Sequence, residues 1–91
     1  MVNGKRKRDR MQVFIDMLTF IQKNNRNGTK ISILTLKTNA SYNMALGYTG
    51  LFVRNGLLEV QQGNNSKRFF ITGRGDEFLE LIKKIGGYLE K

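Results

Sequence analysis

Apolar residues recur at helical spacing in the first part of the chain, between Asp9 and about Lys23. Side chains three and four residues apart lie on one face of a helix, so this stretch predicts an amphipathic helix with Asp9 as its N-cap. The run from Asn24 to Gly28 tolerates left-handed backbone and predicts the end of the helix. The expected apolar stripe consists of Met11, Phe14, Ile15, Leu18 and Ile21.

A second helical pattern covers residues 41–54 and stops at Asn55-Gly56. Ser41 is its expected N-cap, because a serine hydroxyl can accept a hydrogen bond from a free N–H group of the first turn. The predicted buried face consists of Ala45, Tyr48, Thr49 and Phe52, and the opposite face carries Asn43, Gly47, Gly50 and Arg54. That opposite face is unusual, since each glycine in a helix interior costs about 1 kcal/mol relative to alanine.

The narrow face of this helix has two interpretations. A DNA major groove admits an α-helix and offers base edges to Asn and Arg side chains, so the face could approach DNA closely. Alternatively, Gly47 and Gly50 could permit close packing against another helix of the same domain. The sequence leaves both interpretations open.

Two β-prone runs follow at residues 57–62 and 68–72, and a polar turn at residues 63–67 joins them. This pattern predicts a β-hairpin with Lys67 and Arg68 at its tip. Thr72 is the expected N-cap of a last helix that continues to about Leu89. The apolar residues of this helix are Phe78, Leu79, Leu81, Ile82, Ile85, Tyr88 and Leu89.

Residues 29–37 fit either a strand or a short helix by pattern alone, and Thr29 could be a cap or a strand residue. The order of helix, short element, helix, hairpin and helix is that of a winged helix-turn-helix, which makes the short element a helix. We therefore predict an α+β fold with a three-helix core, a two-stranded β-hairpin wing and a C-terminal helix. Residues 1–8 would form a basic tail, residues 9–73 the winged-helix domain and residues 74–91 a dimerisation helix.

The 91 residues carry a formal net charge of +9, which predicts attraction to a polyanion through phosphate contacts. The chain lacks Cys and His, and its acidic residues are scattered, so we expect no enzyme, metal site, cofactor or small-molecule ligand. It contains no apolar run of membrane-spanning length and no signal-peptide pattern, so no membrane partner is expected. The expected location is cytoplasmic and nucleoid-associated.

Candidate DNA contacts come from the helix after Ser41, the hairpin and other basic residues. Asn43 is the best candidate for a base-edge contact, because an Asn amide can pair bidentately with adenine. The expected recognition surface comprises Ser41, Tyr42, Asn43, Leu46, Gly47 and Gly50, and the expected wing surface comprises Asn64, Asn65, Ser66, Lys67 and Arg68. The expected phosphate contacts are Lys5, Arg6, Lys7, Arg8, Arg10, Lys30 and Lys37, although residues 5–8 could equally be a solubilising end.

Several short motifs, taken in order, resemble small archaeal winged helix-turn-helix DNA-binding proteins, a group of predicted transcriptional regulators and basic chromatin-associated proteins. The motifs are Arg10 with its following helix, Asn39-Ala40-Ser41-Tyr42, Tyr48, Asn55-Gly56-Leu57-Leu58, Lys67-Arg68-Phe69-Phe70-Ile71-Thr72, and Gly75 with Phe78-Leu79. The resemblance covers almost the whole chain from Arg8 to Leu89. It implies DNA binding by the helix from Ser41, with Tyr42 and Asn43 leading, a wing at residues 63–68, and a dimer through the last helix.

The apolar end of the last helix also suggests self-association, because so small a core cannot cover all of it. The expected interface comprises Phe78, Leu81, Ile82, Ile85, Tyr88 and Leu89. The leading hypothesis is a homodimeric transcriptional regulator that prefers certain double-stranded DNA sequences. One alternative is an architectural protein with little sequence choice. Another is a protein-interaction module that binds through Leu46, Leu51 and Tyr88.

Overall fold

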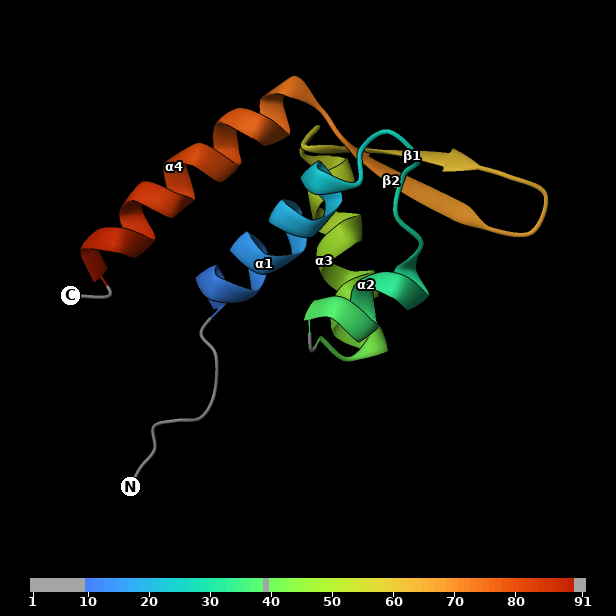
Figure 1. The fold of residues 1–91 in the computed structure, drawn as a ribbon, viewed down its shortest axis with the longest axis horizontal. Coiled ribbons are helices and arrows are strands. Elements are labelled where there is room, and N and C mark those ends of the chain that lie inside the picture. Colours follow the sequence, from blue (N-terminus) through green and yellow to red (C-terminus); the bar gives the residue numbers. More distant parts are fainter. Residues whose placement is uncertain (1–9, 39, 90–91) are drawn as a thin grey trace.

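The computed structural model describes residues 10–38 and 40–89, with side chains described as far as Ile85. Its elements follow the predicted order of helix, short helix, helix, hairpin and helix (Figure 1). They are α1 (Arg10–Lys23), α2 (Ile31–Thr38), α3 (Tyr42–Arg54), β1 (Leu58–Gln62), β2 (Lys67–Ile71) and α4 (Gly73–Leu89). The predicted α+β fold is confirmed. The expected Asp9 cap and the basic tail at residues 5–8 lie outside the described residues.

The core lies between the four helices and the base of the hairpin. In α1 the buried side chains are Val13, Met17, Leu18 and Ile21, whereas Met11, Phe14 and Ile15 are only partly buried. The predicted stripe is confirmed in part, since all five of its residues lie in the core or pack against it, but the prediction omitted the buried Val13 and Met17. Helix α1 packs against α4, α2 and β2, so the extent of its buried face depends on distant segments that the local pattern does not include.

Residues 29–38 combine both structures that the sequence allowed. Thr29 forms a single antiparallel bridge to Phe69, with its N–H donating to the Phe69 carbonyl at 3.0 Å and its carbonyl accepting at 2.9 Å. The chain then turns directly into α2, in which Leu34 is buried. Of the three apolar residues Ile33, Leu34 and Leu36, only Leu34 is buried, and Ile33 and Leu36 are exposed.

The hairpin is a two-stranded antiparallel sheet that pairs Leu58 with Ile71 and Gln62 with Lys67. Each strand lies within one residue of its predicted bounds. Its base is held in the core by Leu58, Phe69 and Ile71, which are buried. The remaining part projects away from the helices (Figure 1). Beyond this base the hairpin is largely exposed to solvent.

Helix α4 begins at Gly73, and the Thr72 hydroxyl accepts a hydrogen bond from the Gly75 N–H at 2.9 Å, which confirms the predicted cap. Leu79 and Ile82 are buried in the core, whereas Leu81 is exposed and covers none of it. The far end of α4 extends away from α3 and the hairpin (Figure 1). Among the described residues, no helix has both the length and the apolarity that crossing a membrane requires.

Candidate nucleic-acid interface

The orientation of α3 is fixed by its cap and by aromatic packing. The Met44 N–H donates to Ser41 Oγ at 3.1 Å, which confirms the predicted N-cap. The Phe14 ring packs edge-to-face on Tyr48 and on Phe52, with centroid distances of 4.9 and 5.0 Å. The predicted buried face of α3 is confirmed, with Ala45, Thr49 and Phe52 buried and Tyr48 packed against the core.

The opposite face of α3 is open. A Cβ placed on Gly47 would meet no described atom within 4 Å, and one placed on Gly50 would meet only the Arg54 guanidinium, at 3.5 Å. The two glycines therefore do not accommodate another helix of the domain, and that interpretation is wrong. Tyr42, Asn43 and Arg54 are exposed at the two ends of the same helix. This face has the narrow profile that would let a ligand approach the backbone.

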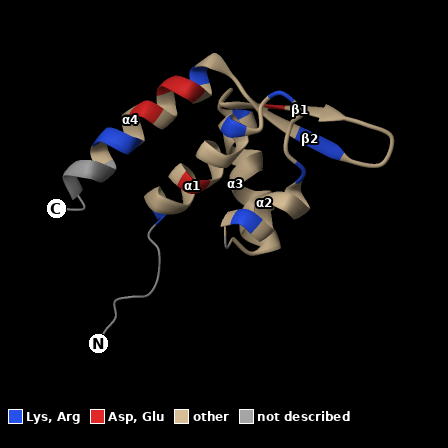
Figure 2. Ribbon diagram, viewed as in Figure 1, with Lys and Arg blue, Asp and Glu red and all other residues tan. Residues whose placement is uncertain are grey.

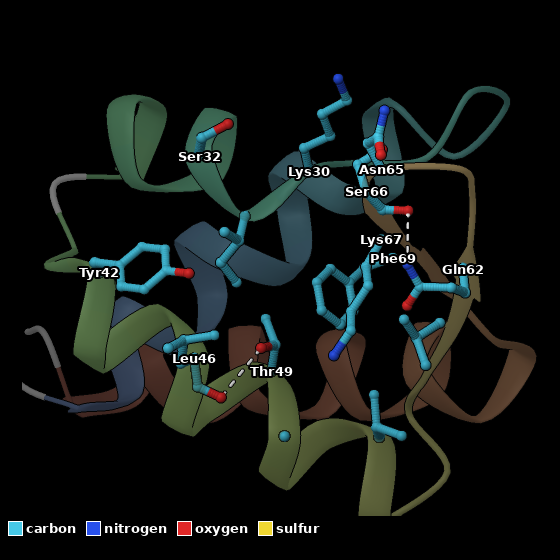
Figure 3. Close-up of a pocket in the computed structure, with 14 residues that line it drawn as sticks. Lys30, Ser32, Tyr42, Leu46, Thr49, Gln62, Asn65, Ser66, Lys67 and Phe69 are labelled. Atoms are coloured by element: carbon cyan, nitrogen blue, oxygen red, sulfur yellow. Dashed lines mark hydrogen bonds between the residues drawn. The ribbon is translucent and has the colours of Figure 1, made fainter.

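A groove of about 560 Å³ runs between α3 and the hairpin (Figure 3). Its apolar lining comes from both sides, with Leu46 and Val53 from α3 and Val60 and Phe69 from the hairpin. Its polar lining includes Lys30, Ser32, Tyr42, Gln62, Asn65 and Lys67. In Figure 3 the Tyr42 ring reaches into the groove from α3 and the Lys67 side chain from β2. The lining of the groove is therefore mixed, with apolar side chains from α3 and the hairpin and cations from Lys30 and Lys67.

The two basic residues at the start of β2 lie on different surfaces. Lys67 lines the groove beside α3, whereas Arg68 lines a smaller depression together with Lys30 and Asn24. The Arg68 Nη1 donates to the Asn27 carbonyl at 3.4 Å, which holds this guanidinium beside the loop before α2. Both side chains are exposed, and they lie in the strand rather than at the hairpin tip, where Asn64 and Asn65 are exposed. The prediction that Lys67 and Arg68 lie at the tip is therefore wrong, because they are the first two residues of β2.

One part of the molecule carries positive charge without acidic residues. The sequence contains no Asp or Glu from residue 17 to residue 58 or from residue 60 to residue 75. The described acidic residues lie on α1, on α4 and at Glu59, and α1 and α4 also carry basic residues (Figure 2). By contrast, the charged residues of α2, the loop before it, α3 and β2 are all basic. The surface formed by α2, α3 and β2 thus offers cations without competing carboxylates, which suits a phosphate backbone.

The comparison with known families agrees with this geometry. The family model described as winged helix-turn-helix matches residues 7–89. This chain belongs to the winged helix-turn-helix family. In this family's terms α2 and α3 form the helix-turn-helix, α3 occupies the position of the recognition helix, and the hairpin is the wing. No curated protein sequence matches the chain significantly.

Three solved structures share the winged-helix fold at low sequence identity. Sso10a-2 of Sulfolobus solfataricus, described as a DNA-binding protein, has a TM-score of 0.79 at 23% identity, over 91% of this chain and 83% of that one. AF1382 of Archaeoglobus fulgidus has a TM-score of 0.71 at 17% identity, over 91% and 92%. SSV1 F-93 has a TM-score of 0.63 at 17% identity, over 93% and 96%. The expected resemblance to archaeal winged-helix proteins is confirmed.

The remaining predicted site residues are dispersed over the winged helix. Arg10 and Lys37 are exposed, at the start of α1 and near the end of α2, and Ser66 is half-buried in the wing turn. Of the expected dimer residues, Leu81 and Ile85 are exposed, Phe78 is half-buried and Ile82 is buried in the domain's own core. The side chains of Tyr88 and Leu89 lie outside those that the structure describes.

Sequence reasoning did not identify the groove, because its walls come from segments distant in the chain. Val53 and Val60 were not predicted as site residues, yet both line it. The available signal was the isolated valine in β1, which has Glu and Gln as neighbours and pairs with the buried Phe69. A single exposed apolar residue is common on protein surfaces, so this signal alone could not have located the groove.

Proposed function

We propose that this winged-helix chain binds double-stranded DNA, with α3 in the major groove and the wing on the flanking backbone. The observation that carries the proposal is the open face of α3, bordered by cations and free of acidic residues in α2, α3 and β2. A major groove accommodates an α-helix, and phosphates on both sides of it need positive charge nearby. That Sso10a-2, a structural relative, is described as a DNA-binding protein supports the proposal.

Each part of the surface has a proposed role. Asn43, exposed on the first turn of α3, is the proposed base-edge contact, because its amide can pair with adenine. Lys67 and Arg68 are the proposed phosphate contacts of the wing, and Lys30 and Lys37 those of the helix-turn-helix. Arg10 and the basic residues before it are proposed to add further backbone contacts.

We propose that the protein acts as a transcriptional regulator with modest sequence preference. The alternative is an architectural protein that coats DNA, and the two glycines of α3 support this alternative because they offer no group for base recognition. The affinity ratio between preferred and unrelated sequences separates the two functions. A ratio below about 10³ would identify the architectural protein.

We also propose a homodimer through α4. Leu81 and Ile85 are 58% and 44% exposed and lie one helical turn apart on the same side of α4. Pairing two copies along this stripe would remove both side chains from water. With two-fold symmetry, the two copies of α3 would contact the same face of DNA, about 34 Å apart.

The test is fluorescence anisotropy of unrelated duplexes of roughly 30 base pairs, about three helical turns, across a salt series. Phosphate-driven binding gives a logarithm of the association constant that falls linearly with the logarithm of salt, by about 0.9 per phosphate contacted. The expected result is tight binding with a slope corresponding to several phosphates. Absence of binding at low salt would reject the proposal and favour a protein-interaction module.

A further inference from the structure

The side of α3 that faces the wing is apolar and open to solvent. Leu46 is 46% exposed and Val60, on the opposite wall of the groove, is 42% exposed. Val53, near the end of α3, is half-buried and also lines the groove. A contiguous exposed apolar surface rimmed by polar groups usually marks a binding site. An occupant with an apolar part would remove these exposed side chains from water.

The surroundings of the groove restrict what this occupant can be. Lys30 and Lys67 line the groove, and none of its lining residues is acidic, so its occupant is expected to carry negative charge. Gly47 and Gly50 lie beside Leu46 and have no side chain that would hold a ligand away from the helix. Leu46, 46% exposed beside these glycines, is a large apolar side chain that a polyanion following this face can contact.

Building on the proposed DNA binding, we propose that Leu46 recognises the C5-methyl group of thymine. Among the four bases, only thymine presents an apolar group in the major groove, while all other edge groups are hydrogen-bond donors or acceptors. Leu46 cannot pair with those groups, and covering them with its side chain would leave them unsatisfied. A thymine methyl at the same place would instead be removed from water by Leu46, whose groove also has Val53 and Val60 among its lining residues.

The experiment compares thymine duplexes with the same duplexes in which deoxyuridine replaces every thymidine. This exchange removes the C5-methyl and leaves every hydrogen-bonding group of the base pair in place. We expect the dissociation constant of the wild-type protein to rise about fourfold for each methyl that is contacted. In the Leu46→Ala variant the two duplexes should bind equally.

A matched control is Leu36→Ala, which removes a leucine that is 75% exposed on α2 and does not line the groove. This variant should keep the full preference for thymine. Because Leu46 and Leu36 are both exposed, both variants should fold, and their circular dichroism and melting temperatures check this directly.

The outcomes separate this inference from the proposed function. Equal affinity of the wild type for both duplexes, with a steep salt dependence, would overturn the methyl contact and leave DNA binding intact. A preference for thymine that persists in Leu46→Ala would also overturn it, because the methyl would then be recognised elsewhere or through duplex shape. No binding to either duplex at low salt would reject DNA binding itself.

Discussion

Asn25 pairs with the backbone of Ile71 through both ends of its side-chain amide. The Ile71 N–H donates to Asn25 Oδ1 at 2.7 Å, and Asn25 Nδ2 donates to the Ile71 carbonyl at 3.4 Å. The side chain thus takes the place that a neighbouring strand would occupy at the end of β2. It links the loop after α1 to the base of the wing and thereby helps to fix the wing relative to the helices.

The Asn25→Ala variant should be less stable, because it leaves a partly buried backbone N–H without a partner. The expected decrease in the free energy of unfolding is about 1–3 kcal/mol. Urea denaturation followed by circular dichroism measures it. Asn27→Ala is the matched control, since Asn27 is an exposed asparagine in the same loop and should tolerate the change. Equal stability of the two variants would contradict the structural role of Asn25.

Gly75 lies so close to the start of the hairpin that a Cβ there would overlap with the Leu57 carbonyl oxygen. Gly75→Ala should therefore push α4 away from this backbone and lower the free energy of unfolding by about 1–3 kcal/mol. Gly73→Ala is the control, because a Cβ at Gly73 meets no described atom within 4 Å. The melting temperature should fall in Gly75→Ala and should stay close to that of the wild type in Gly73→Ala. A melting temperature of Gly75→Ala equal to the wild type would show that α4 can shift freely.

The open face of α3 can be tested by adding a side chain that the fold tolerates. Gly47→Leu should keep or raise the stability of the protein, since no described atom lies near and leucine favours helix by up to about 1 kcal/mol over glycine. If DNA approaches this face, the same variant should bind DNA at least several-fold more weakly. Thermal denaturation and anisotropy are measured on one preparation. Unchanged affinity in a stable variant would exclude close approach of DNA at Gly47.

If the wing contacts phosphates, Lys67 and Arg68 should contribute more to the salt dependence of DNA binding than lysines on α4 do. Replacing Lys67 and Arg68 with Ala should weaken binding to all sequences and reduce the salt slope by about 2. The control replaces Lys83 and Lys84, which lie on α4 beyond its acidic residues and carry the same total charge (Figure 2). A similar loss of slope in both variants would indicate a nonspecific effect of net charge.

The proposed dimer should depend on the exposed stripe of α4. Replacing Leu81 and Ile85 with Glu places charges where two copies would meet, so the variant should be a monomer. Analytical ultracentrifugation over a concentration series measures the mass. Leu36→Glu is the control, because it makes the same kind of change on α2 and should leave the assembly as in the wild type. A wild-type protein that is monomeric at every concentration would reject the dimer.

Local signals predicted most of the elements of this winged helix. The Ser41 and Thr72 caps are formed as expected, because each depends only on backbone groups within a few residues. The ends of the first and third helices were also indicated, since Gly28 and Gly56 take positive φ values of 83° and 75°, which disfavour other residues. The buried face of α3 followed from its periodicity. These features need no knowledge of distant parts of the chain.

The tertiary structure decided which surfaces are buried and which remain available. The sequence could not choose between strand and helix for residues 31–38, because Thr29 needs Phe69 for its bridge and Leu34 needs the helices that bury it. It also did not predict that Val13 and Met17 of α1 are buried, because the elements that pack against α1 come from other parts of the chain. The groove beside Leu46 exists only where the wing meets α3. Caps and turns are short-range and are specified by adjacent residues, whereas burial and grooves depend on segments that folding brings together.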